Sequence, residues 1–127
     1  MRAYIDSDVL IWYLRGEPKA DRFFKKIKKN NEYTLCIGSM QRAEIVFFMR
    51  PEEESMTDLF LSQFNTVSVD QKIIDDAGKL FRKYNPSHGV DANDAILAAT
   101  AYNTGGIIYT LNKKHYPMPD LPIKKAW

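Results

Sequence analysis

The sequence predicts an α/β fold in which a mainly parallel sheet lies between two layers of helices. Short apolar runs alternate along the chain with segments whose apolar residues recur at helical spacing. Strands that alternate with helices typically form a parallel sheet covered on both faces. No repeat, low-complexity stretch or linker interrupts the 127 residues, and a chain of this length supports one hydrophobic core. We therefore expect a single domain over residues 1–127, built as a three-layer α/β/α sandwich.

The first half of the chain contains two predicted strands, each followed by helices. The first strand includes Tyr4 and Ile5 and ends at Asp6. Ser7 is expected to cap the next helix, because its hydroxyl can accept from the free amides of a helix start. The other predicted elements are a mostly buried helix over 9–14 that Gly16 and Pro18 interrupt, a polar helix over 19–29, a strand over 33–37 and a helix over 40–47 that Pro51 stops.

The second half contains the clearest helical periods. Asp70 is expected to cap an amphipathic helix that runs to Tyr84, and glycines at 105 and 106 are expected to end an alanine-rich helix. The elements of this half are a helix over 52–64, a short strand marked by Val67 and Val69, the amphipathic helix, a loop over 85–89, the alanine-rich helix over 91–103, a strand over 107–109 and a last edge strand over 121–123.

Composition excludes several classes of protein. No apolar run approaches the roughly 20 residues of a membrane span, and the N-terminal residues reach Asp6 too early for a signal peptide. Cys36 is the only cysteine, so no disulfide forms within the chain. His88 and His115 lack the spacing of zinc ligands. These features favour a cytoplasmic protein.

Positive charge is concentrated in two places, although the net charge is only +2. Each run alone is explained by a solvated face, and an RNA-binding track is the alternative. The runs are Lys25, Lys26, Lys28 and Lys29 in the first, and Lys113, Lys114, Lys124 and Lys125 in the second.

Acidic residues occupy the positions where an α/β sheet usually carries its chemistry, after the carboxyl ends of strands. Asp6 ends one strand, Asn112 follows another, Glu44 lies about one turn into a helix, and Asp91 and Asp94 are three residues apart at a helix start. Two carboxylates about 5 Å apart repel by roughly 3 kcal/mol at an effective dielectric near 20. A divalent cation removes this conflict, and an oxygen-only ligand set favours Mg²⁺ or Mn²⁺.

Structural roles are the alternative for most of these residues. Asp6 can cap the first helix, Asp91 can complement a helix dipole, and Asp8 can be a first-turn charge. Thr110 either ends a strand or orients a group of the site. Asp94 is the hardest to explain structurally, since it lies in an otherwise alanine-rich, buried helix.

Four segments of the sequence resemble, in order, the four motifs of PIN domains. Residues 6–11 (DSDVLI) are similar to the opening signature, and Ser39 followed five residues later by Glu44 resembles the second motif. Residues 94–101 (DAILAATA) resemble the third, and residues 110–116 (TLNKKHY) resemble the fourth. The resemblance spans nearly the whole chain and is greatest to VapC toxins, the ribonuclease halves of toxin–antitoxin pairs. It implies a PIN-like fold and a metal-dependent endoribonuclease.

The resemblance also implies roles for individual residues. Asp6 and Asp94 are expected to bind Mg²⁺ or Mn²⁺ directly, and Glu44 is expected to bind the metal or to position and deprotonate the attacking water. Asn112 completes the site, where many PIN domains carry an acid, and His115 also stands where an acid is common.

Supporting roles and partners follow from the same resemblance. An RNA substrate, a VapB-like antitoxin and a second copy of the chain in a homodimer are the expected partners. Lys113 and Lys114 are expected to bind the RNA backbone. The groups expected to hold the catalytic residues in place are Asp8, Ser39, Asp91 and Thr110.

Two other functions compete with the nuclease. A PIN-like module that binds RNA or protein without cutting is favoured by the neutral Asn112, but the acids Asp6, Glu44 and Asp94 argue against it. A phosphoacceptor signalling domain also gathers acids at strand ends, and Lys113 resembles its late lysine. That class leaves Glu44 and the Asp94 helix unexplained.

Overall fold

The fold consists of a five-stranded parallel sheet with helices on both sides, in a computed structural model that describes residues 1–127. The strands lie in the order β3-β2-β1-β4-β5, and every neighbouring pair is parallel. Their bounds are β1 Arg2–Ile5, β2 Thr34–Gly38, β3 Asn65–Val67, β4 Ile107–Thr110 and β5 Ile123–Lys125. The helices are α1 Ser7–Leu14, α2 Pro18–Lys28, α3 Ser39–Val46, α4 Glu54–Leu61, α5 Gln71–His88 and α6 Ala92–Thr104, with short 3₁₀ turns at Pro51–Glu53 and Lys113–His115.

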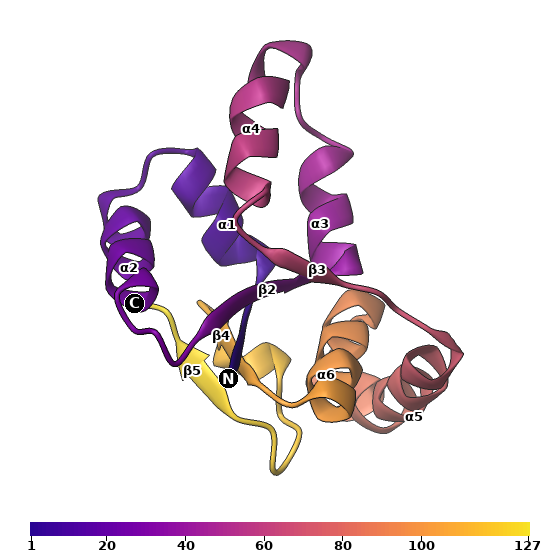
Figure 1. The fold of residues 1–127 in the computed structure, drawn as a ribbon. Helices are drawn as coiled ribbons and strands as arrows, with labels where there is room; N and C mark the ends of the chain where they lie inside the picture. The colour runs from indigo at the N-terminus through magenta and orange to yellow at the C-terminus, as the bar shows by residue number, and fades with distance from the viewer.

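Two apolar layers form because alternate residues of each strand point to opposite faces of the sheet. Ala3 and Ile5 of β1 pack against α1, α2 and α4, whereas Tyr4 packs against α5 and α6. Figure 1 shows the sheet between these two groups of helices. The predicted three-layer α/β/α architecture with a parallel sheet is therefore confirmed. None of the helices combines the length and apolar character needed to cross a membrane.

A side chain next to α6 fixes where this helix starts. The position of Asp94 depends on that start, because Asp94 lies in the first turn. The Asp91 side chain accepts a hydrogen bond from the Asp94 amide at 2.8 Å, which is the contact of a helix N-cap. Seven residues of α6 are buried, Asp94 among them. This helix is buried on most of its surface, so its alanines allow close packing against α5 and the sheet.

Several predicted boundaries were wrong. The residue that caps α1 is Asp6, which accepts from the Ser7 amide at 2.8 Å, and not Ser7. The segment 85–89 is not a loop, because α5 continues through Pro86 to His88. Pro86 lies in the last turn, where Gly89 at φ +66° closes the helix by donating to the Asn85 carbonyl at 2.9 Å.

The two edge strands also differ from their predicted positions. β3 covers Asn65–Val67 and excludes Val69, because its partner β2 ends at Gly38, opposite Val67. β5 begins at Ile123 and extends to Lys125, beyond the predicted end. Pro122 lacks an amide donor and therefore contributes only its carbonyl, which accepts from the Ile108 amide at 3.0 Å.

Candidate active site

Asp6 lies at the carboxyl end of the central strand β1, where three donors fix its buried side chain. Its amide donates to the Tyr109 carbonyl of β4 at 3.0 Å, so Asp6 stays aligned with the sheet. One carboxylate oxygen accepts from the Ser7 amide at 2.8 Å. The other accepts from the Thr110 hydroxyl at 3.0 Å and the Tyr116 hydroxyl at 2.8 Å. The carboxylate is therefore held from both sides before any ligand binds.

Thr110, the last residue of β4, connects Asp6 to a second acid. The Asp8 carboxylate accepts from the Thr110 hydroxyl at 3.2 Å, from the Leu111 amide at 3.1 Å and from the Val9 amide at 2.7 Å. The single hydroxyl proton of Thr110 is thus shared between two carboxylates. The orienting role that the sequence left open for Thr110 matches this geometry.

Asp94 brings a further carboxylate to the same edge from the first turn of α6. Burial, followed by the charges of Asp91 and Asp6, raises the pKa of Asp94 to about 7. Burial and the charge of Asp8 raise the pKa of Asp6, and burial raises that of Asp8. Each shift has the direction that excess negative charge in a poorly solvated site produces.

Positive groups are scarce around these acids. No Lys or Arg forms an ion pair with Asp6, Asp8, Asp91 or Asp94. The nearest basic group is the half-exposed ring of His115, whose Nδ1 lies 3.9 Å from an Asp94 carboxylate oxygen. The site therefore carries negative charge that the protein itself does not neutralise.

Tyr116 is the residue of the site that the sequence did not single out. It is 4% exposed, and its hydroxyl donates to Asp6. Burial and the charges of Asp6 and Asp94 raise the pKa of Tyr116 well above its usual value, so the hydroxyl keeps its proton. Its place at the end of the fourth motif was the only signal available.

Glu44 lies near the acids but does not contact them. Its carboxylate accepts from the Asn93 side-chain amide at 2.9 Å, and Asn93 precedes Asp94 in α6. No set of three His, Cys, Asp or Glu side chains is close enough to hold a metal ion as the side chains stand. The structure brings Asp6 and Asp94 together, with Asp8 and Asp91 beside them. Glu44 contacts Asn93, the neighbour of Asp94 in the sequence, and not Asp94 itself.

The remaining predicted residues lie at the margin of the site. Asn112 is exposed, caps the turn at Lys113–His115 by accepting from the Lys114 amide at 3.2 Å, and contacts the His115 ring at 3.0 Å. Ser39 donates to the Val67 carbonyl at 2.8 Å and forms no hydrogen bond with the acids. Lys113 and Lys114 are exposed in the same turn as His115 and form no ion pair.

The donor set fits a hard divalent cation. Mg²⁺ is usually bound by one or two carboxylates while it keeps several of its waters. Asp6 and Asp94 supply two buried carboxylates whose mutual repulsion a cation relieves. Asp6 and Asp94 both offer carboxylate oxygens, and oxygen ligands favour Mg²⁺ or Mn²⁺ over zinc.

Comparisons with known proteins identify the family and agree with the fold. The family model of the PIN domain matches residues 3–121. Ribonuclease VapC19 of Mycobacterium tuberculosis is 33% identical over 119 residues, which cover 92% of this chain and 94% of that protein. Ribonuclease VapC10 of the same organism is 33% identical over 115 residues, covering 90% of this chain and 85% of that protein.

Solved structures show the same fold at lower sequence identity. VapBC2 from Rickettsia felis, bound to a promoter DNA fragment, superposes with a TM-score of 0.81 at 20% identity and 98% coverage of both chains. DNA-bound VapBC from Salmonella typhimurium gives a TM-score of 0.81 at 19% identity, covering 100% of this chain and 99% of that one. The family match over residues 3–121 and the two relatives at 33% identity show that the chain belongs to the PIN-domain family.

Proposed function

We propose that this protein is a metal-dependent endoribonuclease like the VapC ribonucleases to which it is similar. The observation that carries the proposal is the buried Asp6–Asp94 pair, which no Lys or Arg neutralises. A domain stable by roughly 5–15 kcal/mol does not retain such repulsion without a compensating use. Binding of Mg²⁺ or Mn²⁺ during RNA hydrolysis supplies that use.

The contacts of the residues suggest a different role for each of them. Asp6 and Asp94 would hold the metal, which when bound polarises the phosphodiester and lowers the pKa of a water molecule. Thr110 and Tyr116 keep the Asp6 carboxylate in one orientation through their hydroxyl groups. Glu44 accepts from Asn93, the residue before Asp94, and would orient the attacking water and take up its proton.

An antitoxin of the VapB type is the proposed protein partner, since the structural neighbours include VapBC complexes. A cleft of about 640 Å³ between α1, α2 and α4 offers an apolar surface beside acidic residues. The apolar segment of such a partner would occupy this cleft. An Arg of the partner would form two hydrogen bonds with a carboxylate of the Asp6–Asp94 site. The residues that line the cleft include Tyr13, Leu14, Met56, Leu59, Glu17 and Asp21.

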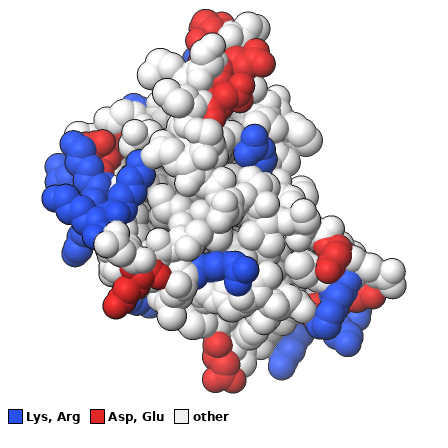
Figure 2. Space-filling model, viewed as in Figure 1, with Lys and Arg blue, Asp and Glu red and all other residues white.

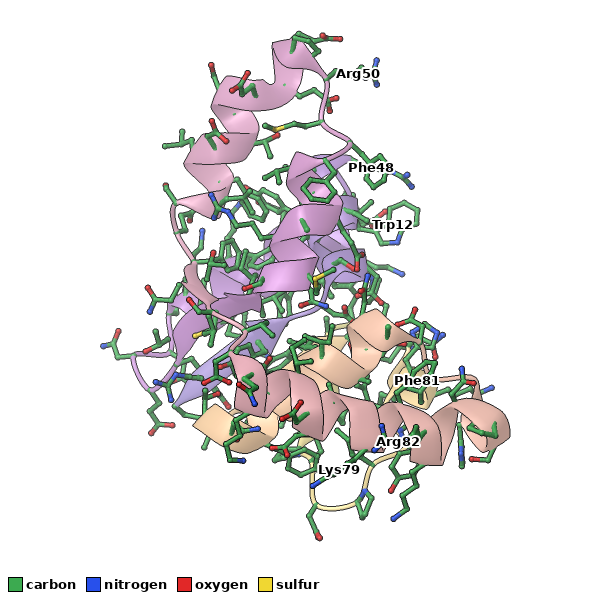
Figure 3. All side chains as sticks on the ribbon, turned by 90° about the vertical axis from the view of Figure 1, so that its right-hand side faces the viewer. Trp12, Phe48, Arg50, Lys79, Phe81 and Arg82 are labelled. Carbon is green, nitrogen blue, oxygen red and sulfur yellow. The ribbon has the colours of Figure 1, made fainter.

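A homodimer is the proposed assembly. Trp12 of α1, Phe48 after α3 and Phe81 of α5 are 42%, 81% and 36% exposed, and Figure 3 shows all three toward the right of the view. Exposed aromatic side chains gathered on one side are typical of a protein interface. We expect Phe48→Glu to lower the molar mass measured by light scattering, and an unchanged mass would remove this face from the proposed interface.

The cleavage assay separates the enzyme from a non-catalytic binding module, which the exposed, neutral Asn112 favours. Purified protein should cut single-stranded RNA in Mg²⁺ or Mn²⁺, and EDTA should abolish the cutting. Asp94→Asn should lose cleavage by several orders of magnitude, while Asp75→Asn, an exposed Asp of α5, should cut like the parent. RNA that binds but stays intact with either ion would favour the binding module.

A further inference from the structure

A cleft of about 340 Å³ lies between α2 and β5. Lys26 of α2 and Lys124 and Lys125 of β5 line it, and no acidic residue does. None of these lysines forms an ion pair, whereas the neighbouring Lys25 is paired with Asp21 at 2.8 Å. Figure 2 shows Lys and Arg side chains gathered over α2 at the left of the view. The cleft is therefore positively charged and suited to an anion.

Aromatic side chains line the same cleft. Phe23, Tyr33 and Tyr109 all border it. The ring of Tyr109 lies 5.4 Å from that of Phe23 and 6.2 Å from that of Tyr33, measured between centroids. Phe23 and Tyr33 are only half-buried. Aromatic surface beside unpaired lysines is the combination that binds bases and phosphates together.

The cleft reaches the edge of the sheet where Asp6 lies. Lys125 pairs with Thr110 in the β4–β5 ladder, and the Ala126 amide donates to the Thr110 carbonyl at 2.9 Å. The Thr110 hydroxyl in turn donates to Asp6. Tyr109 precedes Thr110, so the two side chains point to opposite faces of the sheet. The cleft and the acids are thus neighbouring sites on opposite sides of β4.

We infer that this cleft binds a segment of the single-stranded RNA substrate, outside the site where the phosphodiester is cut. The inference rests on the proposed function, because it takes RNA as the substrate. The lysines bind phosphates, and unpaired bases stack on Phe23 and Tyr33. Double-stranded RNA keeps its bases inside the helix, and an acidic peptide leaves the aromatic surface unused, so both fit the cleft less well.

Binding of a short labelled RNA to the metal-free Asp94→Asn protein tests the inference by fluorescence anisotropy at several salt concentrations. The triple variant Lys26→Ala, Lys124→Ala and Lys125→Ala removes the three lysines that line the cleft. It should reduce the slope of log K against log salt by about 2, since each contact in a single strand contributes about 0.7. Tyr33→Ala should weaken binding about tenfold without changing that slope.

A matched control removes three lysines outside the cleft, two from α2 and one from the residue that follows it: Lys25→Ala, Lys28→Ala and Lys29→Ala. This variant has the same net charge as the cleft variant and should retain most of the parent slope. Equal loss of slope in both triple variants would overturn the inference, because general attraction to α2 would then explain the binding. Tighter binding of duplex RNA, or displacement of RNA by an acidic peptide with no effect of Tyr33→Ala, would overturn it as well.

Cleavage measurements keep this inference separate from the proposed function. If the parent cuts RNA while the cleft variant binds and cuts like the parent, the cleft assignment fails and the nuclease stands. If the parent never cuts but the cleft variant and Tyr33→Ala weaken RNA binding as described, the nuclease fails and the cleft remains an RNA site. If both hold, the cleft variant should raise KM for long RNA and leave kcat nearly unchanged.

Discussion

Asp94→Asn separates stability from activity, because it keeps the size of the side chain and removes one charge from the acidic site. The pKa of Asp94 rises from 3.8 to about 7, and a shift of this size corresponds to about 4 kcal/mol at 1.36 kcal/mol per unit. Burial is the largest cause of the shift and the charges of Asp91 and Asp6 follow; water at the edge of the site reduces both effects, so we expect a gain of about 1–3 kcal/mol.

Urea denaturation at pH 8 without metal measures this gain, because Asp94 of the parent is then ionised. The difference should shrink as the pH falls toward 4, where the parent carboxyl carries a proton and matches Asn in charge. With Mg²⁺ or Mn²⁺ at 100 times its dissociation constant, the parent should gain about 2.7 kcal/mol. Asp94→Asn should gain far less, having lost a ligand, and should lose cleavage.

A purely structural Asp94 predicts the opposite result. If Asp94 only stabilised the start of α6, Asp94→Asn would be less stable than the parent at pH 8 and would still cut RNA. That result would refute the site as described. Asp75→Asn is the control for charge alone, because Asp75 is exposed on α5 and forms no ion pair. Its stability should stay within about 0.5 kcal/mol of the parent.

Further predictions concern the groups around Asp94. In the metal-free parent, the free energy of unfolding should fall as the pH rises from about 4 to about 7, because the folded state keeps the Asp94 proton that the unfolded state has already lost. A free energy of unfolding that rises over that range would contradict the raised pKa of Asp94. Tyr116→Phe removes one of the donors to Asp6 and should cost about 1–2 kcal/mol in urea denaturation, and an unchanged midpoint would mean that water replaces the hydroxyl. The double variant Lys113→Ala and Lys114→Ala should reduce the slope of log K against log salt for RNA binding by about 1.4. An unchanged slope would mean that both lysines are solvated surface residues that do not bind RNA.

The sequence predicted the fold well because periodicity and capping are local properties. The amphipathic period after Asp70 and the alanine-rich segment before Gly105 predicted α5 and α6, and the apolar runs predicted β1, β2 and β4. The end of α5 was missed because Pro86 usually marks a boundary, while here it occupies the last turn before Gly89. The edge strands were misplaced because their register is set by partner strands.

The site was predictable only in part, since its contacts join distant positions. Asp6 and Asp94 stood out as acids in apolar surroundings, and both lie in the site. Tyr116 did not stand out, because its partner lies 110 positions away and its surroundings in sequence resemble a surface loop. Glu44 lies in the helix that the sequence predicted, but only the packing of α3 on α6 shows that its contact is Asn93.

The hydrogen bond from Tyr116 to Asp6 joins positions 110 residues apart, and this has a consequence for synthesis. Ribosomes add about 5–20 residues per second, so about 6–22 seconds separate the appearance of these two residues. Thr110, the other side-chain donor to Asp6, is also made late. A nascent chain therefore displays Asp6 long before it contains the hydroxyl groups that orient it. During that interval the chain does not yet contain an assembled acidic site.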